Sequence, residues 1–582
     1  MILVLTVLIG LVITTGGCPP KPDGGEGEGE GEGEGEIQIP NLMGQLQTDA
    51  QAAIVAAGLA VGTVNTACSD TIASRYVINT NPTGGTIANH GSVVNLTIST
   101  GPCLIKINTI EELQLIGNNS AYPLNGDYIL TQDIDASATV NWNNGAGFKP
   151  IGQFSGVFNG QGYIITNLII NRPSEGRIGL FEIVLTDGEI INVGFEGGAI
   201  TGYSSVGGLT GGNYGGVVTN CYATGTITGY SNVGGLMGFN KGVVTNCYAT
   251  GAVVGEGGSY VGGLTGYNSG QLTDCYATGA VTGYDNVSYG GVGGLVGCNS
   301  GGMGGDITNC YATGAVTGYD NVSYGGVGGL IGFNFGQLAD CYATGVITGY
   351  GYNVGGLTGC NYGGVLTNCY TTGAVISEGG LYIGGLTGYN SGQLTDCYTT
   401  GAVTGYDNVG YGGVGGLVGY NSGGVVTNCY ATGTITSQGY MGGLVGYNRY
   451  GGVVTNCYAT GAVTGYNNVN YSSGGLVGYN INGGVVTNCY ATGTITGQSY
   501  YMSGLVGWNY DGTTVITSFW DIQTSGQTTS VGGGTGLTTA EMTQQATFTG
   551  AGWNFDSVWT IEEGCTYPYL QTLVSPFAGC VL

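Results

Sequence analysis

The sequence predicts an all-β chain in which a right-handed parallel β-helix, a solenoid, follows a small α+β domain. Glycine supplies 124 of the 582 residues and tyrosine 42, whereas charged residues make up only 7%, far below the share of about a quarter found in globular domains. The mean hydropathy is positive, at +0.18, which separates the chain from disordered Gly-rich sequences. A unit of about 26 to 35 residues also recurs along the chain, and such a period is typical of solenoids.

The repeated unit occupies residues 201–516. A typical copy reads Val-Gly-Gly-Leu-Val-Gly-Tyr-Asn, then Gly-Gly-Val-Val-Thr-Asn-Cys-Tyr-Ala-Thr-Gly, then Ala-Val-Thr-Gly-Tyr. Each copy holds two or three short β-prone runs between Gly turns, so we expect one coil per copy, stacked through parallel strands. At about 4.8 Å per coil, ten coils extend for about 50 Å. The cysteine of the unit falls at Cys221, Cys247, Cys275, Cys310, Cys341, Cys369, Cys397, Cys429, Cys457 and Cys489, and Ser518 replaces it in a degenerate last copy.

This unit resembles the GLUG repeat, and Gly-Gly-Leu-Val-Gly is the hallmark of that family. The resemblance covers the whole repeated region and implies a β-helix. GLUG repeats also accompany IgA-specific metalloproteases, but the protease motif is missing from this sequence, so the resemblance implies no such activity here.

Equivalent side chains of stacked coils form ladders. In the run Val-Thr-Asn-Cys-Tyr-Ala, strand alternation places Thr, Cys and Ala on one face and Asn and Tyr on the other. We expect the small Cys and Ala to point inward, with the thiols acting as buried apolar groups, and Tyr to point outward. A register shift of one residue would reverse the two faces.

The outward tyrosines are the candidate ligand-binding stripe, because an aromatic face stacks on sugar rings and the hydroxyl adds a polar contact. The alternative is that they stack only on one another and stabilise the solenoid. The stripe consists of Tyr222, Tyr248, Tyr276, Tyr311, Tyr342, Tyr370, Tyr398, Tyr430, Tyr458 and Tyr490.

The N-terminus predicts export. Residues 1–15 are almost wholly apolar and Gly16-Gly17-Cys18 follows, which suits a signal peptide over 1–18. The segment resembles a bacterial lipoprotein cleavage site, and that resemblance implies that Cys18 carries the lipid anchor. The alternatives are a simply secreted chain and an uncleaved anchor. Residues 19–36 alternate Gly and Glu for much of their length, and we expect a disordered spacer there.

Residues 37–102 predict the small domain. Thr48-Asp49-Ala50-Gln51 reads as a capping box that opens a helix ending at Gly58, and residues 59–64, 76–80 and 93–98 read as strands. The order of these elements, with Ile39-Pro40-Asn41 and Asn81-Pro82-Thr83-Gly84-Gly85, resembles a PASTA domain. That resemblance implies binding of peptidoglycan or its fragments, and the alternative is a spacer module.

Residues 103–200 and 517–582 are expected to cap the solenoid. A second capping box at Thr109-Ile110-Glu111-Glu112 predicts a short helix over the first sheet edge. Three Trp-containing runs near the C-terminus supply large apolar groups for the other end. Because exported chains permit disulfides, we predict a bond between Cys565 and Cys580, with Cys68 and Cys103 as a second pair.

The composition excludes several kinds of function. A formal net charge of −26, with only 8 basic residues, leaves no cationic footprint for nucleic acid. His90 is the only histidine, so the usual catalytic triads and His-based zinc motifs cannot form within one chain. No Cys-x-x-Cys spacing predicts a metal site, and we expect no cofactor.

The sequence therefore predicts a non-enzymatic, lipid-anchored protein of the cell envelope or surface that acts in adhesion or binding. Its expected partners are cell-wall or extracellular polysaccharide or a surface protein, and the membrane through the anchor. Two alternatives stay open, a purely architectural surface protein and a carbohydrate-active β-helix enzyme. A hydrolase would need paired carboxylates, and Asp274, Asp340 and Asp396 recur before ladder cysteines. We interpret them as replacements for Asn within a ladder.

Overall fold

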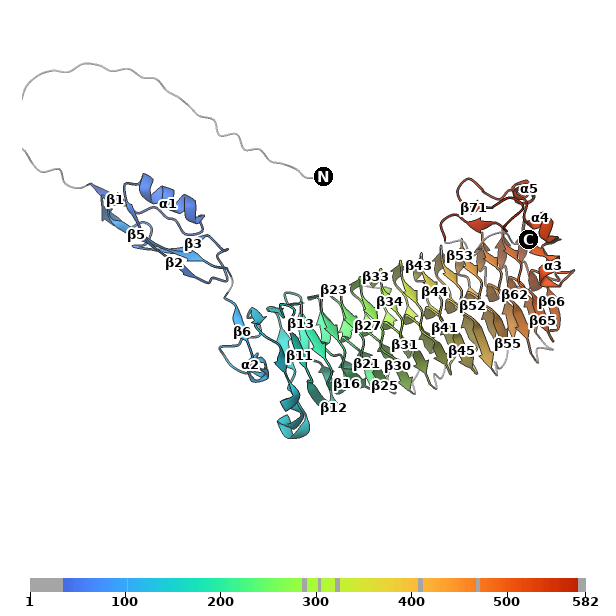
Figure 1. The fold of residues 1–582 in the computed structure, drawn as a ribbon, viewed down its shortest axis with the longest axis horizontal. Helices are drawn as coiled ribbons and strands as arrows, with labels where there is room; N and C mark the ends of the chain where they lie inside the picture. The colour runs from blue at the N-terminus through green and yellow to red at the C-terminus, as the bar shows by residue number, and fades with distance from the viewer. Residues whose placement is uncertain are drawn as a thin grey trace, which may run out of the picture. The chain divides into compact units, whose positions relative to one another are not determined.

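The computed structural model describes residues 35–101, 103–284, 290–301, 305–319, 325–406, 412–466 and 471–573. The chain divides into two compact units, one that ends at Cys103 and one that begins at Leu104 (Figure 1). The predicted lipid-bearing Cys18 and the disulfide candidate Cys580 lie outside the described residues. Among the residues that are described, no helix is both long and apolar enough to cross a membrane.

The first unit packs one helix against a small sheet. Strand β5 lies between β2, to which it is parallel, and β3, to which it is antiparallel. Ala50 and Ile54 of the helix are buried against the strands. The elements are β1 (Glu36–Gln38), α1 (Gln47–Ala56), β2 (Ala60–Ala67), β3 (Val77–Asn81), β4 (Ile87–Asn89) and β5 (Val93–Ser99).

The predicted helix and three strands are confirmed, with two differences. Helix α1 begins at Gln47, and Leu46 occupies the N-cap without a side-chain hydrogen bond. The predicted capping box at Thr48 is therefore wrong, since Thr48 already lies inside the helix and bonds Asp49. Gly58 ends the helix with a φ of 77°, as expected. Strands β1 and β4 are too short to leave a pattern in the sequence. The Cys68–Cys103 disulfide is present.

The second unit is a parallel β-solenoid of about fifteen coils, as its two 15-stranded sheets indicate. A coil contains five short strands, more than the two or three that the sequence predicts, because strands of two or three residues carry no readable alternation. One coil comprises β21 (Ser231–Gly234), β22 (Met237–Asn240), β23 (Val243–Thr245), β24 (Tyr248–Ala249) and β25 (Val253–Glu256).

Four sheets run the length of the solenoid, and their strands pair in parallel with the equivalent strands of the next coil (Figure 1). We name each after a feature of its repeat. The valine sheet runs from β6 (Ile105–Ile107) to β68 (Thr514–Ile516), the tyrosine sheet from β8 (Ile134–Asp135) to β70 (Thr535–Leu537), the double sheet from β12 (Ile169–Ile178) to β66 (Tyr501–Ser503), and the asparagine sheet from β9 (Ile151–Phe154) to β67 (Val506–Tyr510).

The interior of the solenoid is a set of apolar ladders. The predicted inward positions of Cys and Ala are confirmed, because Cys221 and Cys247 are fully buried and Ala223 and Ala249 are buried with them. The predicted inward position of Thr is wrong. Val218 points inward in the preceding strand and its neighbour Thr219 does not.

The reason lies at the corner between the valine and tyrosine sheets. Asn220 adopts a φ of 54° there, and Asn246 a φ of 51°. These left-handed residues turn the chain between two strands, so the alternation of faces does not carry across the corner. Asn tolerates this conformation better than other non-glycine residues, which explains its place in the repeat.

A buried asparagine ladder runs through the asparagine sheet and was not predicted. In ten consecutive coils the Asn Nδ2 donates to the Oδ1 of the next Asn at 2.8 to 3.0 Å. The same Nδ2 also donates to a backbone carbonyl of its own turn, as Asn334 does to Gly336 at 3.0 Å. The ten donors, fully buried, are Asn213, Asn240, Asn268, Asn299, Asn334, Asn361, Asn390, Asn421, Asn448 and Asn480.

Glycine beside this ladder is required by close approach. A Cβ at Gly364 would collide with the Nδ2 of Asn334 and with the Oδ1 of Asn361. The ladder ends at Asn509, which accepts from Asn480. At its start Asn213 Oδ1 is buried without a partner, because the preceding coil has Val184 at this register.

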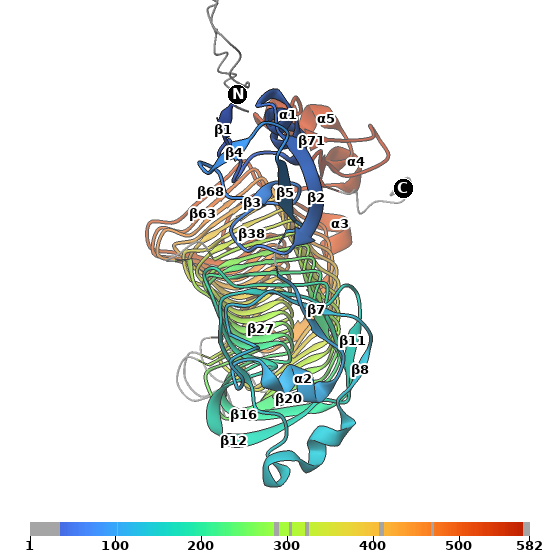
Figure 2. The same ribbon diagram turned by 90° about the vertical axis from the view of Figure 1, so that its left-hand side faces the viewer.

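Caps close both ends of the solenoid. Helix α2 (Ile110–Leu115) has Thr109 as its N-cap, and the Thr109 hydroxyl accepts from Glu112 N as predicted. The second bond of the predicted capping box is not formed, because the Glu112 carboxylate accepts from Asn108 N in place of Thr109 N. Ile110 and Leu113 join the core cluster, and α2 lies across the end of the coils that faces the viewer in Figure 2. At the other end, α4 (Thr539–Met542), α5 (Gln545–Gly550) and β71 (Trp559–Thr560) fold back beside the last coils (Figure 1).

We predict that Asn334→Leu destabilises the solenoid by about 2 to 5 kcal/mol, because it leaves a buried donor of Asn299 and a buried acceptor of Asn361 without partners. Urea unfolding of the full chain, followed by circular dichroism, measures the change. Asn509→Leu is the matched control, since it breaks only the terminal contact, and its effect should be at most half as large. Equal effects of the two substitutions would contradict a continuous ladder.

Candidate binding face

The predicted tyrosine stripe forms one continuous stack on the outside of the tyrosine sheet. Successive rings along the ten coils lie 4.7 to 5.0 Å apart, centroid to centroid, with interplanar angles of 2° to 11°. Each inner ring therefore has another tyrosine over both of its faces. Such offset stacks stabilise neighbouring coils, and they present only ring edges and hydroxyls to the outside.

The two end rings of the stack are covered as well. A Cβ at Gly194 would collide with the ring of Tyr222, so this ring packs on the backbone of the preceding coil. Tyr490 pairs in register with Phe519. The stripe consequently offers no free aromatic face, so a sugar ring cannot stack on it. Stacking is one of the two contacts expected from the sequence, and the hydroxyl contact is the other.

The C-terminal cap covers the last part of the stripe. Tyr430, Tyr458 and Tyr490 are at most 2% exposed and belong to a cluster with Trp553 and Trp559 of the cap. The hydroxyl of Tyr490 donates to Pro568 O at 2.6 Å. These three candidate residues are therefore part of the core of the cap and cannot contact a ligand.

The cap is held in this position by a buried aspartate. Asp521 Oδ2 accepts from the hydroxyls of Thr539, at 2.6 Å, and Tyr567, at 2.8 Å, while Oδ1 caps α3 (Ile522–Ser525). The Trp-containing runs, which the sequence predicts to cap the C-terminal end of the solenoid, therefore also cover the side of its last coils.

The hydroxyls along the stripe differ in their hydrogen bonding. Tyr222 donates to Glu196 Oε1 at 2.7 Å. In the part of the chain that the structure describes, no hydrogen-bond partner is found for the hydroxyls of the next six tyrosines. We call these six the open stripe: Tyr248, Tyr276, Tyr311, Tyr342, Tyr370 and Tyr398, all half-buried.

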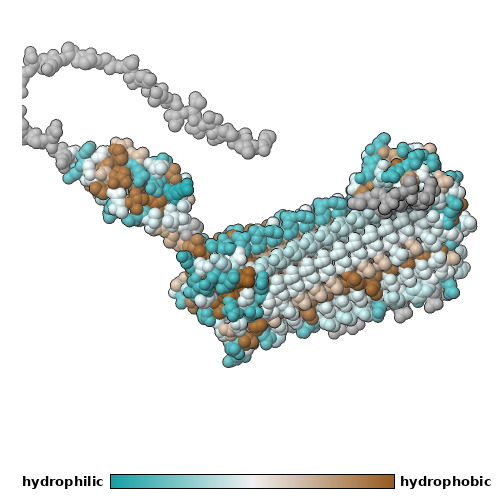
Figure 3. All heavy atoms as spheres, viewed as in Figure 1, coloured by the Kyte–Doolittle hydropathy of each residue, from teal (hydrophilic) through white to brown (hydrophobic). Residues whose placement is uncertain are grey.

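Rows of polar side chains flank the open stripe. On one side stand the corner residues, of which Asn220, Asn246 and Asp274 are examples, and on the other a row of threonines that begins at Thr224 and Thr250. Rows of like side chains parallel to the axis are visible as bands of constant colour on the face shown in Figure 3. The open stripe and its flanks therefore form a regular surface of hydrogen-bonding groups.

The three recurring aspartates belong to the corner ladder. Asp274, Asp340 and Asp396 adopt φ values of 54°, 56° and 53°, the left-handed conformation of the asparagines they replace. Asp274 and Asp340 accept side-chain hydrogen bonds from Asn309 and Asn368 of the following coils. This arrangement agrees with shape replacement in a ladder, since each aspartate is separated from the next by an asparagine coil.

The ladder cysteines are buried free thiols. Their Sγ atoms contact backbone carbonyls, such as Cys397 Sγ to Thr395 O at 3.2 Å. Burial raises the pKa of Cys369, Cys397, Cys429 and Cys457 well above the ordinary thiol value, so these groups stay protonated and unreactive. Among the described residues, no group of three or more His, Cys, Asp or Glu side chains could hold a metal ion.

A second aromatic row, which was not predicted, lies on the outer face of the asparagine sheet. Tyr389, Tyr420, Tyr447 and Tyr479 occupy equivalent positions of successive coils, and Cys298 takes the same position earlier in the solenoid. The recurring Gly-Tyr-Asn triplet carries both this row and the buried Asn ladder, and it is the pattern that could have predicted them.

Cys565 is disulfide-bonded. Its predicted partner Cys580 lies outside the described residues, so the pairing itself stays a prediction.

Comparison with protein families confirms both resemblances. Residues 37–100 match the PASTA domain. Seven segments match the GLUG motif, namely 202–228, 257–282, 288–317, 323–348, 410–436, 437–464 and 469–496. The chain thus contains a PASTA domain followed by GLUG repeats, and the unmatched copies between those segments form coils of the same solenoid.

Two relatives share part of the sequence. Halomucin of Haloquadratum walsbyi is 42% identical over 120 residues, which cover 20% of this chain and 1% of that protein. A putative Gly-rich membrane protein of Evansella cellulosilytica is 42% identical over 93 residues, or 15% of this chain and 11% of that protein. The matches therefore span a small part of the length of either relative.

Two solved structures are similar at low scores. A putative immunoglobulin A1 protease from Bacteroides ovatus gives a TM-score of 0.18 at 17% identity, covering 81% of this chain and 92% of that one. A structure titled IgA1 Protease gives 0.22 at 14% identity, covering 66% and 21%. Scores this low carry no argument about activity.

Buried tyrosines make the solenoid sensitive to alkali. Burial raises the pKa of Tyr260 and Tyr447 from 10.0 to about 12. The stability that depends on these neutral phenols is fully present below pH 10 and is lost as the pH rises from 10 to about 12, because the unfolded chain ionises first. We predict that the urea midpoint falls over this range, and that Tyr260→Phe/Tyr447→Phe reduces the fall. A midpoint independent of pH up to 12 would contradict it.

Proposed function

We propose that this chain is an exported, lipid-anchored protein of the cell envelope that binds polysaccharide along its solenoid and catalyses no reaction. The PASTA domain and the names of the two relatives, a halomucin and a Gly-rich membrane protein, support an envelope or surface location. The anchor on Cys18 and the Gly-Glu spacer are the parts of this proposal that rest on the sequence alone.

The open stripe is the observation that carries the binding function. Its six phenol hydroxyls have no protein partner among the described residues, and their rings repeat every 4.7 to 5.0 Å. A polysaccharide is a long polymer of hydroxyl groups, and it can satisfy many of these phenols at once. Each contact contributes little, but contacts on one chain multiply through effective concentration.

The PASTA domain offers a second contact with the envelope. We propose that it either binds peptidoglycan fragments or lifts the solenoid away from the anchor as a spacer. A surface protein is the alternative partner of the solenoid, although the regular spacing of the stripe fits a repetitive polymer better than an irregular protein surface.

An architectural role is the second candidate, and the closed aromatic stack favours it. Every ring of the stripe has both faces covered, so the stack already has a complete structural purpose. In that case the hydroxyls would meet only water, and the solenoid would serve as a stiff projection from the cell.

We predict that Tyr276→Phe/Tyr311→Phe/Tyr342→Phe weakens binding of the full chain to insoluble polysaccharide by about tenfold or more, because three hydrogen-bonding groups are lost while the stack is kept. A depletion assay against a panel of cell-wall and extracellular polysaccharides, including peptidoglycan, measures the bound fraction.

Tyr203→Phe/Tyr230→Phe is the matched control. This pair is also exposed and stacked, with centroids 5.1 Å apart, but it lies on the double sheet. The control should bind like the unchanged chain. If the triple variant also binds unchanged, or if the unchanged chain binds nothing on the panel, the architectural role is favoured and the proposal is wrong.

We also predict that Cys18→Ser moves the protein from the membrane fraction to the soluble fraction, because each buried acyl methylene contributes about 0.8 kcal/mol to anchoring. Fractionation of cells and mass spectrometry of the mature N-terminus measure the change. A mature N-terminus without acyl chains in the unchanged protein would contradict lipid anchoring.

A further inference from the structure

The first coils contain a pocket of mixed polar and apolar lining that neither family match accounts for. It has a volume of about 380 Å³ and is lined by Gln114, Leu115, Asn118, Trp142, Asn143 and Lys149. These residues come from α2, from the turn after it and from the segment that leads into β9. All of them lie between the PASTA match, which ends at residue 100, and the first GLUG match, which begins at residue 202.

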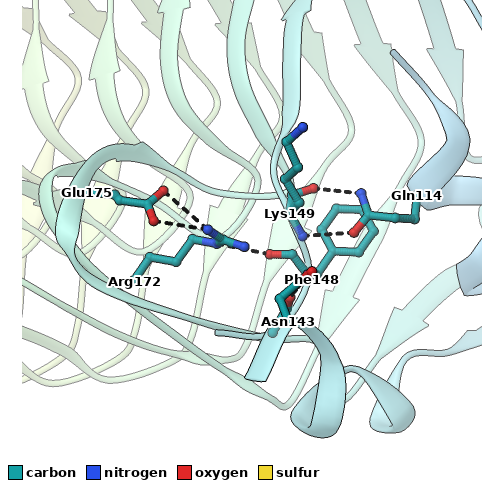
Figure 4. Close-up of polar contacts among 7 residues, drawn as sticks. Gln114, Asn143, Phe148, Lys149, Arg172 and Glu175 are labelled. Atoms are coloured by element: carbon teal, nitrogen blue, oxygen red, sulfur yellow. Dashed lines mark hydrogen bonds and ion pairs between the residues drawn. The ribbon is translucent and has the colours of Figure 1, made fainter. Parts of the chain in front are cut away.

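The pocket is held together by the side-chain amide of Gln114. Its Nε2 donates to Lys149 O at 2.9 Å and its Oε1 accepts from Lys149 N at 2.8 Å, as Figure 4 shows. Because the backbone of Lys149 makes these contacts, the lysine is fixed in place without using its side chain. In Figure 4 that side chain points away from the Arg172–Glu175 pair.

The Trp142 indole forms another wall. It stacks on Phe148 with a centroid distance of 6.4 Å and an interplanar angle of 25°, so one face is used for packing. After Trp142, Asn143 and Asn144 adopt φ values of 51° and 58°, and each such residue costs about 1 to 3 kcal/mol. This strained turn belongs to no ladder, and Asn143 Nδ2 closes it by donating to Gly147 O at 2.7 Å.

The groups left unused in the pocket are hydrogen-bond donors. Lys149 Nζ donates to Asn118 Oδ1 at 3.0 Å and has two further protons. In the described part of the chain no carboxylate pairs with Lys149, whereas Arg172 and Arg177 have Glu175 and Glu182. The indole N–H of Trp142 likewise has no partner among the described residues. A ligand that presents acceptors, and an anionic one above all, fits these donors.

We propose that this pocket binds a uronic acid residue of an acidic polysaccharide. The ammonium of Lys149 takes the carboxylate, the sugar ring lies against Trp142, and the Asn143 amide contacts ring hydroxyls, while Asn118 holds the ammonium in place. This inference rests on the proposed polysaccharide binding and names a sugar class for it. The net charge of −26 does not oppose a single contact of this kind, because salt screens charges beyond about 8 Å.

Calorimetric titration of the full chain with trigalacturonic acid and with its neutral methyl ester tests the inference. The acid should bind at least about tenfold more tightly than the ester, the range expected for one charge-assisted hydrogen bond. Lys149→Gln should remove this preference, so that the acid and the ester bind with equal affinity. Trp142→Ala should weaken both ligands, and Trp142→Phe should restore part of the loss.

Lys106→Gln is the matched control, because Lys106 is an exposed lysine of β6 and does not line the pocket. It should bind both ligands as the unchanged chain does. Equal affinity for acid and ester, no binding of either, or an acid preference that survives Lys149→Gln would overturn the inference. Binding at the open stripe is measured separately, by the depletion assay of the Tyr→Phe triple variant. Failure of the uronic acid site can therefore be distinguished from failure of polysaccharide binding along the stripe.

Discussion

Parallel hydrogen bonding between successive coils is the constraint on which the rest of the structure depends. It places every side chain against its own equivalent one coil away, so each position must be occupied by a residue that packs well on itself. Asn satisfies this condition because its amide is both donor and acceptor, and Tyr satisfies it by stacking at 4.7 to 5.0 Å. Like charges placed opposite one another repel, which explains why only 7% of the residues are charged.

The sequence predicts the parts of this fold that follow from periodicity. The repeat predicts the coils, and the small size of Cys and Ala predicts that they point inward. The left-handed corner at Asn220 breaks the alternation on which the prediction for Thr rested. The Asn ladder was missed because a polar residue in a Gly-rich segment reads as a turn, and only its recurrence in every copy marks it as a buried, self-satisfied group.

The sequence predicts correctly that the tyrosine stripe lies on the outside of the solenoid, but it does not predict that the faces of its rings are covered. Strand alternation places the tyrosines outside. No pattern within one copy predicts that stacking covers both faces of every ring, or that Trp559 and its neighbours fold over Tyr458 and Tyr490. Both are long-range effects. The tyrosine stripe is therefore left with hydrogen-bonding edges. The first coils contain a pocket with a lysine and a tryptophan, Lys149 and Trp142, which need not pack on an equivalent residue of the next coil.

Hydrogen exchange of the asparagine side-chain amides tests most directly whether self-complementary ladders hold the coils in register. In the full chain labelled with ¹⁵N at asparagine, the side-chain amides of the ten donors from Asn213 to Asn480 are each bonded twice and fully buried. We expect these amides to exchange as slowly as the backbone of the core strands, over hours or longer. Exchange of all asparagine side chains within minutes would show that they are solvated and would contradict the account.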